Sequence, residues 1–285
     1  MRPPLSRLFP RSWYNRIQVL SDIHLEVGQQ YTSFTFPATA PYLLLAGDVG
    51  RLLDYDSYLA FLKKQILRYE NVFLVLGNHE FYGMSYSAAL ESAQRLTEEP
   101  SLAQRLVLLS RTRWDSPRSN LSILGCTMWS LVPDERIDIV QSKINDFQKI
   151  EGWTVASHNQ VHTQEATWLR DQVAGLAQSK DLDSRSLLVA THHAPCIEGS
   201  SRPEHAESPW SSAFATEMLA SGGWDPVKTW VFGHTHHSTD MVRNGIRVVA
   251  NQRGYVVPST GSGKSMSRKS AMPTSFDATK VITVE

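Results

Sequence analysis

The sequence predicts an α/β protein in which helices are layered on a mixed sheet. Short apolar runs alternate with amphipathic stretches along the first part of the chain, and strand-rich stretches follow later. The apolar runs are rich in valine, isoleucine and leucine and are too short for helices, so we interpret them as buried strands. With 41% hydrophobic residues, the 285-residue chain also has enough apolar material for a sizeable core.

Eight strands are predicted from these apolar runs. Five of them lead directly into a polar motif and cover residues 16–20, 42–46, 71–76, 187–190 and 229–232. Three more have a similar composition and cover residues 105–109, 121–124 and 246–250. Runs that lack a polar alternation are typical of inner strands, which are buried on both faces.

Helical patterns fill several of the intervals between the strands. Apolar residues recur at helical spacing over residues 55–69, 85–96 and 157–176. His158 and His162, four positions apart in the longest of these helices, are interpreted as part of its polar face. No glutamate accompanies them in the spacing of a zinc protease motif.

We expect one main domain with an extension at each end. Residues 1–15 form an N-terminal extension, and residues 16–257 form the domain. Within it, a segment of about 133–155 interrupts the alternation and is predicted to be a cap-like insertion. Residues 258–285 form a tail rich in serine, glycine and lysine that returns to a last strand.

Composition limits the classes of function and the location. The 28 basic residues balance the 28 acidic ones, so the simplest electrostatic argument for a nucleic-acid or membrane-surface protein is absent. No run approaches the roughly 18 apolar residues of a membrane span. The chain has two cysteines, which form no CxxC pair, and extracellular disulfide frameworks usually carry more, so a reducing compartment is favoured. We expect a cytoplasmic protein, and the prolines of the basic N-terminus disfavour a mitochondrial presequence.

The chemistry is concentrated where five strands end. The motifs are D-x-H at 22–24, G-D at 47–48, G-N-H-E at 77–80, H-H at 192–193 and G-H-T-H at 233–236. Each motif alone has an ordinary explanation as a turn or a structural histidine. Their ordered occurrence at strand ends, which converge on one crevice in an open α/β sheet, argues against coincidence. Carboxylate, amide and imidazole ligands suit Mn, Fe or Zn.

This ordered set resembles the signature of the calcineurin-like metallophosphoesterase superfamily. The resemblance spans Asp22 to His236 and implies a four-layer α/β/β/α sandwich with a dinuclear metal centre. It implies that Asp22, His24 and His236 hold one metal ion. The other ion would be held by Asn78, His192 and His234, with Asp48 bridging both.

The resemblance also implies roles for residues around the two ions. His79 matches the histidine that contacts the phosphate and the leaving group, so it is the predicted catalytic residue. His192 stands first after its strand and is the preferred ligand of the His-His pair, which leaves His193 behind the ligands. Arg253, in the N-Q-R-G-Y segment, has two open roles, as a substrate contact or as a salt-bridge or turn residue.

Departures from the superfamily's protein Ser/Thr phosphatases narrow the prediction. Those enzymes read G-D-x-x-D-R-G and R-G-N-H-E. Here Gly47–Arg51 lacks the second aspartate, and Leu76 stands where an arginine would precede Gly77. A protein phosphatase is therefore disfavoured, although Glu80 matches their pattern.

The predicted function is a metal-dependent phosphoesterase with two divalent or trivalent ions of Mn, Fe or Zn. It would hydrolyse a small phosphomonoester or phosphodiester by attack of a metal-bound hydroxide. A nuclease of the same fold is one alternative, disfavoured by the neutral charge, and a non-catalytic protein-binding scaffold is another. No membrane or protein partner is inferred. The substrate, the metal and the oligomeric state stay open.

Overall fold

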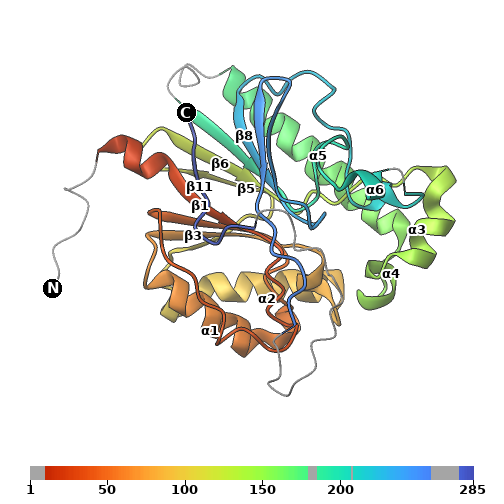
Figure 1. Cartoon of the computed structure of the whole chain (residues 1–285), viewed down its shortest axis with the longest axis horizontal. Helices are drawn as coiled ribbons and strands as arrows, with labels where there is room; N and C mark the ends of the chain where they lie inside the picture. The colour runs from red at the N-terminus through yellow and green to blue at the C-terminus, as the bar shows by residue number, and fades with distance from the viewer. Residues whose placement is uncertain (1–9, 179–184, 207, 258–275) are drawn as a thin grey trace.

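The protein is built from two mixed β-sheets that face each other, with helices on both outer sides (Figure 1). The structure, a computed structural model, describes residues 10–178, 185–206, 208–257 and 276–285. The predicted four-layer α/β/β/α sandwich is thereby confirmed. Most of the predicted N-terminal extension and residues 258–275 of the predicted tail lie outside the described residues.

The first sheet has the strand order β11-β1-β2-β3-β4. The four strands β1 to β4 are parallel, and β11 adds antiparallel to β1 at one edge. Because neighbouring parallel strands point the same way, the loops that follow β1, β2 and β3 open at the same edge. The bounds are β1 Arg16–Leu20, β2 Tyr42–Ala46, β3 Asn71–Val75, β4 Leu106–Leu108 and β11 Val281–Thr283.

The second sheet has the order β5-β6-β7-β8-β10-β9, with β6, β7, β8 and β10 parallel. Its bounds are β5 Thr112–Asp115, β6 Leu121–Gly125, β7 Ser186–Ala190, β8 Val227–Phe232, β9 Thr239–Arg243 and β10 Ile246–Ala250. The sequence did not predict β5 and β9. Both lie at sheet edges, where alternating exposure replaces the continuous apolar run of an inner strand.

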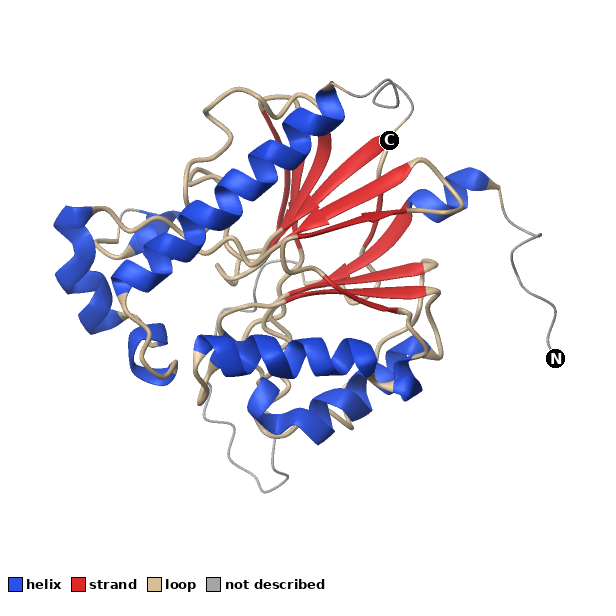
Figure 2. Ribbon diagram, turned by 180° about the vertical axis from the view of Figure 1, so that it is seen from behind, coloured by secondary structure: helices blue, strands red, loops and turns tan. Residues whose placement is uncertain are grey.

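Helices cover the outer faces of both sheets (Figure 2). The helices α1, Tyr55–Ile66, and α2, Tyr86–Glu98, pack on the first sheet, and α5, Val155–Ala177, packs on the second. Successive side chains of β2 divide accordingly, since Leu43 and Leu45 join the core under α1 and α2 while Leu44 lies between the sheets. Thr154 and Ser157 form a capping box that begins α5.

Three short helices gather at one end of the molecule, beyond the carboxyl ends of the central strands (Figure 1). They are α3, Ile137–Lys143, α4, Asp146–Lys149, and α6, Pro203–Ala206. The helices α3 and α4 occupy the segment predicted as a cap-like insertion. Backbone hydrogen bonds from Gly83 to Lys149 and from Glu151 to Met84 attach this segment beside the loop that follows β3.

Candidate metal centre

The structure brings the predicted ligands together between the two sheets. Each ligand lies in a loop that directly follows a parallel strand: Asp22 and His24 after β1, Asp48 after β2, Asn78 after β3, His192 after β7, and His234 and His236 after β8. The side chains form two groups, within each of which the ligand atoms lie within 4.8 Å of one another. One contains Asp22, His24, Asp48 and His236, and the other contains Asp48, His192 and His234.

These loops turn sharply enough to force an unusual backbone. Positive φ angles occur at Asp22 (52°), His24 (45°), Asp48 (52°), His234 (71°) and His236 (49°). A residue with a Cβ adopts this left-handed region at an energetic cost, and such strain persists where the surrounding structure imposes it. The strain therefore coincides with five of the seven predicted ligands.

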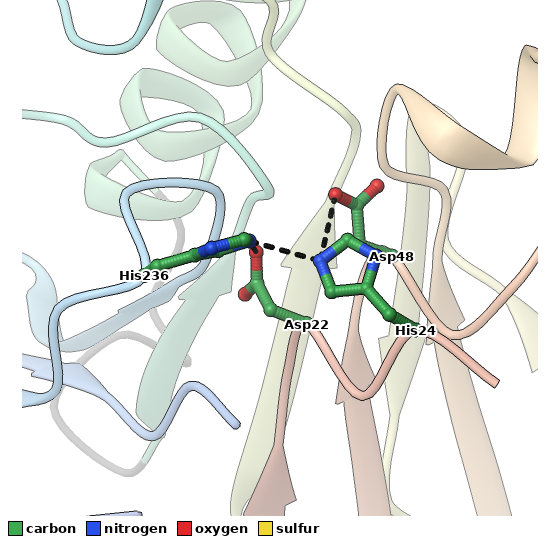
Figure 3. A group of neighbouring side chains, drawn as sticks. All are labelled: Asp22, His24, Asp48 and His236. Carbon is green, nitrogen blue, oxygen red and sulfur yellow. Dashed lines mark hydrogen bonds and ion pairs between the residues drawn. The ribbon is translucent and has the colours of Figure 1, made fainter. Parts of the chain in front are cut away.

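We call the first group, with Asp22, His24 and His236 as its own members, the open half-site (Figure 3). The Nε2 atoms of His24 and His236 lie 2.9 Å apart, and His236 Nε2 lies 3.5 Å from Asp22 Oδ1. His24 Nε2 lies 3.8 Å from Asp48 Oδ2, so Asp48 borders this group. The side chain of His236 is 30% exposed, which leaves this half-site in contact with solvent.

We call the second group, with His192 and His234 as its own members, together with the neighbouring Asn78, the enclosed half-site. His192 Nε2 lies 3.4 Å from Asp48 Oδ1 and 3.2 Å from Asn78 Oδ1. The opposite nitrogen, His192 Nδ1, lies 2.9 Å from the carbonyl oxygen of Ala46. A proton shared with that carbonyl fixes the tautomer and leaves Nε2 free for a metal ion.

Two features of these groups fit metal ions. The Nε2 atom of His234 is buried and has no hydrogen-bond partner among the described residues, which a coordinated ion would supply. Gly77 lies so close to the ligands that a Cβ there would stand 2.5 Å from the Asp48 nitrogen and 2.7 Å from His192 Cε1. Because glycine has no side chain, Gly77 lets its loop approach Asp48 and His192 more closely than any other residue would.

The charges of the buried Asp48 carboxylate and the imidazoles around it also fit metal ions. Burial raises the pKa of Asp48, but the neighbouring imidazoles, His192 foremost, outweigh it and hold this pKa well below its ordinary value. Burial lowers the pKa of His192, but Asp48 outweighs it and raises the pKa to about 10. In the ion-free protein, positive charge from imidazoles thus offsets the buried carboxylate. Cations would take over that role.

His79 lies beside Asp48 at the mouth of the centre. Its backbone nitrogen donates to Asp48 Oδ1 at 2.9 Å, its Nδ1 lies 2.8 Å from Glu26 Oε1, and its Nε2 lies 3.0 Å from Tyr255 Oη. Burial lowers the pKa of His79, but Asp48 and Glu26 together outweigh burial and raise it. Glu26 also lies 3.2 Å from His24 Nδ1, so one carboxylate orients two imidazoles.

Sequence reasoning missed Glu26 and Tyr255, and it missed the role of Glu80. The buried Glu80 carboxylate accepts hydrogen bonds from the backbone nitrogens of Asp48, Val49, Gly50 and Gly77 and from Tyr58 Oη. It therefore fixes the loops after β2 and β3 to each other. The signal was the adjacency of Glu80 to the G-N-H motif, and the D-x-H-x-E spacing was the signal for Glu26.

Asp146, at the start of α4, is a further residue that the sequence did not reveal. Its Oδ1 accepts a hydrogen bond from Asn78 Nδ2 at 2.7 Å and another from Tyr82 Oη at 2.7 Å. These bonds fix the amide so that Asn78 Oδ1 faces His192. The insertion therefore reaches a predicted ligand, although its sequence carries no recognisable motif.

The remaining predicted residues lie outside the two groups of ligand atoms. His193 is buried behind the ligands, where its ring stacks on His234 with centroids 4.1 Å apart. Arg253 donates to the Ile23 carbonyl at 2.9 Å and to Gln30 Oε1 at 2.8 Å. These contacts favour the structural alternative for Arg253 over the substrate contact.

The expectation that His158 and His162 form a polar face of α5 is wrong. Both are buried: His158 Nε2 accepts a hydrogen bond from the Ser130 nitrogen, and His162 Nδ1 lies 2.8 Å from the Trp129 carbonyl oxygen. The loop after β6 crosses this side of the helix and offers polar backbone groups that periodicity alone could not reveal.

Comparison with known proteins places the chain in a family. The sequence model of the calcineurin-like phosphoesterases matches residues 15–238. An uncharacterised protein of Acanthamoeba polyphaga mimivirus is 24% identical over 265 residues, which cover 84% of this chain and 91% of that protein. None of the described helices is long and apolar enough to cross a membrane.

Solved structures show the same fold. A phosphopantetheinyl hydrolase from Mycobacterium tuberculosis aligns with a TM-score of 0.61 and 17% identity over 84% of this chain and 89% of its own. A candidate 5′-nucleotidase from Staphylococcus aureus aligns with a TM-score of 0.50 and 13% identity over 84% of this chain but only 49% of its own. The family match covers well over half of this chain and contains every predicted ligand from Asp22 to His236. The predicted resemblance is confirmed, and the protein belongs to the calcineurin-like phosphoesterase family.

Proposed function

We propose that the protein is a dinuclear metal-dependent phosphoesterase that hydrolyses a small phosphomonoester or phosphodiester. The observation that carries this proposal is the meeting of two groups of nitrogen and oxygen donors on the shared carboxylate of Asp48. A clamp of two ions stabilises both the attacking and the leaving oxygen in phosphoryl hydrolysis. A cluster that served only to stabilise the fold would have no need of a shared carboxylate.

Bound Mn, Fe or Zn ions would make a water more acidic and neutralise the phosphoryl oxygens. The chain's own contribution is position and charge. Asp48 sits between the two half-sites, Glu26 orients His24, and the Ala46 carbonyl orients His192. His24 and His192 are thereby held with Nε2 toward the centre before any ion binds.

His79 is the proposed acid for the leaving group. Glu26 holds its Nδ1, so its Nε2 points away from Glu26 and contacts Tyr255 Oη. A leaving oxygen of the substrate would replace Tyr255 as the partner of Nε2. A proton held on Nε2 can pass to the leaving oxygen as the bond to phosphorus breaks. Burial lowers the pKa of His79, but the Asp48 charge and the pairing with Glu26 outweigh burial and favour the protonated imidazole that this role requires.

The test separates binding from chemistry. The purified protein should contain close to two transition-metal ions per chain and should hydrolyse small phosphate esters. The His79→Ala variant should keep its metals and lose roughly 10²–10⁴-fold in turnover, the usual range for one acid–base group. Full turnover in this variant would contradict the catalytic role, and metal loss would make His79 a ligand.

The nuclease and scaffold alternatives predict other outcomes of the same assays. A nuclease would degrade single- or double-stranded nucleic acid faster than small esters. A scaffold would bind no metals, or would bind them without turnover. The balanced charge of 28 basic and 28 acidic residues is unfavourable for a nuclease, and the complete ligand set is unfavourable for a scaffold.

A further inference from the structure

A cavity of about 280 Å³ lies beside the metal centre, between α6 and the loop that precedes β8. We propose that it binds an apolar, ring-sized group on the ester oxygen of the substrate, an inference that rests on the proposed phosphoesterase function. Its apolar surface comes from Ile197, Ala206, Trp210, Phe214 and Ala215. The substrate class is then a phosphate ester of an aromatic or similarly bulky apolar alcohol.

The cavity continues into the pocket that contains the metal ligands. His205, Trp210, Phe214 and Thr235 line both spaces. The Phe214 ring stacks on the ring of His234, with centroids 4.8 Å apart and planes 28° apart. The wall of the cavity is therefore in direct contact with a proposed ligand.

The chemistry of the walls selects a neutral occupant. Among the described residues that line the cavity, His205 is the only titratable one, and the others are apolar or hydroxyl-bearing. The hydroxyl of Ser200 already donates to the Ile197 carbonyl at 2.9 Å. A second phosphate or a carboxylate would lose its hydration there without a matched cation, whereas an apolar group would gain from leaving water.

The opposite side of the centre has the contrary character. A second cavity adjoins the metal pocket through His79, Tyr82 and Tyr255 and is lined by the charged residues Glu26, Arg51 and Lys149. The two sides therefore differ in polarity, and the apolar group of a substrate has one favourable direction. The cavity size suits this group, because an apolar cavity of about 150 Å³ already holds a benzene molecule.

Substrate comparison is the first test. We expect 1-naphthyl phosphate to be hydrolysed with a kcat/KM at least about tenfold above that of phenyl phosphate, since the two leaving groups are of similar acidity and differ in apolar size. The Ala206→Trp variant should lower this ratio to near one. The same type of change on the exposed face of α5, Ala174→Trp, should leave the ratio as in the wild type. An unchanged ratio in Ala206→Trp would overturn the proposal.

Binding of a neutral probe distinguishes this proposal from the proposed function. We expect 1-naphthol to bind the metal-stripped wild-type protein, as measured by calorimetry, and to bind Ala206→Trp at least about tenfold more weakly. Naphthol binding without any phosphate hydrolysis would support the binding of an apolar group in the cavity and contradict the proposed phosphoesterase function. Hydrolysis of both esters at equal kcat/KM, with no naphthol binding, would leave the function standing and overturn the cavity's role.

Discussion

The two halves of the proposed metal centre share Asp48 but differ in how they are enclosed. In the open half-site, His236 is 30% exposed and stands against Tyr255, whose ring centroid lies 4.8 Å away. In the enclosed half-site, His192 is fully buried and His234 is sandwiched between the rings of His193 and Phe214. The open half-site therefore has a solvent-exposed member, whereas the members of the enclosed half-site are buried, with Asn78 and His234 at the wall of the metal pocket and His192 behind them.

The difference also concerns the residues behind the ligands. The enclosed half-site has a support for each ligand: the Ala46 carbonyl for His192, Asp146 for Asn78, and the ring stack for His234. In the open half-site, Glu26 orients His24 but also serves His79. Substitutions of the residues behind the ligands should accordingly affect metal binding in the enclosed half-site, and both His24 and the chemistry of His79 in the open half-site.

The largest effect is expected from the shared carboxylate. Asp48→Asn should reduce the content of both metals, because the amide removes the negative charge that faces His24 and His192. Turnover should fall at least about 10²-fold, since the ions stabilise the transition state by several kcal/mol. Elemental analysis and phosphatase assays measure this. An Asp48→Asn protein with two metals and full turnover would show that the Asp48 carboxylate is not a ligand shared by the two half-sites.

The second prediction uses the different solvent exposure of His236 and His192 to distinguish the open half-site from the enclosed one. His236→Ala and His192→Ala should each lose one metal ion. Added imidazole should restore metal and turnover only in His236→Ala, because free imidazole can reach a position whose side chain is 30% exposed but not the fully buried position of His192. Equal rescue of both variants would show that the enclosed half-site opens in solution. The metal content of each variant, with and without imidazole, measures the difference.

The third prediction concerns a residue behind the enclosed half-site. Asp146→Asn keeps an oxygen that can accept from Asn78 Nδ2 but loses the negative charge, so this hydrogen bond weakens and the Asn78 amide is held less firmly with its oxygen toward the metal position. Partners behind ligands typically matter 10–100-fold. We expect metal affinity, from competition with a chelator, to fall by that factor at one of the two ions.

Asp138→Asn on the neighbouring helix α3, where the side chain is exposed, is the matched control and should bind both metals as the wild type does. If Asp146→Asn also kept wild-type affinity, the insertion would have no part in positioning Asn78.

The parts of the structure that the sequence predicted are those with a local signal. The inner strands of both sheets were predicted because their burial on both faces appears as a continuous apolar run, as at Tyr42–Ala46. The predicted ligands come together because each follows directly after such a strand. In β9, Thr239–Arg243, exposure alternates, and the sequence contains no comparable run.

The parts that were missed depend on contacts between distant segments. Asp146 lies 68 positions from Asn78, and no pattern in the insertion indicates which ligand it contacts. Tyr255 lies 176 positions from His79, to which it is hydrogen bonded. His158 was misread for the same reason, because its partner Ser130 belongs to a loop whose path periodicity does not determine.

A smaller effect is expected from the residue adjacent to His192 in the chain. His193→Ala should keep both metals, because His193 belongs to neither group of ligand atoms and its contact with His234 is a ring stack. Turnover should fall by about tenfold, the lower end of the range for residues behind ligands. Loss of a metal in His193→Ala, with retention in His192→Ala, would exchange the two assignments.

The smallest effect on the metal centre itself is expected from the scaffold behind the enclosed half-site, where the expected change is in stability and depends on pH. The Thr127 carbonyl accepts hydrogen bonds from the backbone nitrogens of His192 and His193. The adjacent Met128 nitrogen donates to the Glu165 carboxyl group on α5 at 2.7 Å. Complete burial raises the pKa of Glu165 from its ordinary 4.5 to about 8. Folded Glu165 therefore keeps its proton over a pH range in which the unfolded chain has lost it.

The sign of the pH dependence follows from this difference. Between pH 4.5 and about 8 the folded state binds more protons at Glu165 than the unfolded state does, so the free energy of unfolding falls as pH rises. One proton contributes a slope of at most about 1.4 kcal/mol per pH unit.

Glu165→Gln keeps an oxygen that can accept from Met128 but has no proton to lose, so it should flatten the slope of the free energy of unfolding against pH. Urea unfolding at pH 5, 6, 7 and 8 (roughly the range of the titration) compares it with the wild type. Glu151→Gln, at an exposed position, should unfold with the wild-type slope. A constant difference in stability between Glu165→Gln and the wild type at all four values would show that Glu165 is ionised in the fold. The loop behind the enclosed half-site would then be held by a buried charge rather than by a neutral carboxyl group.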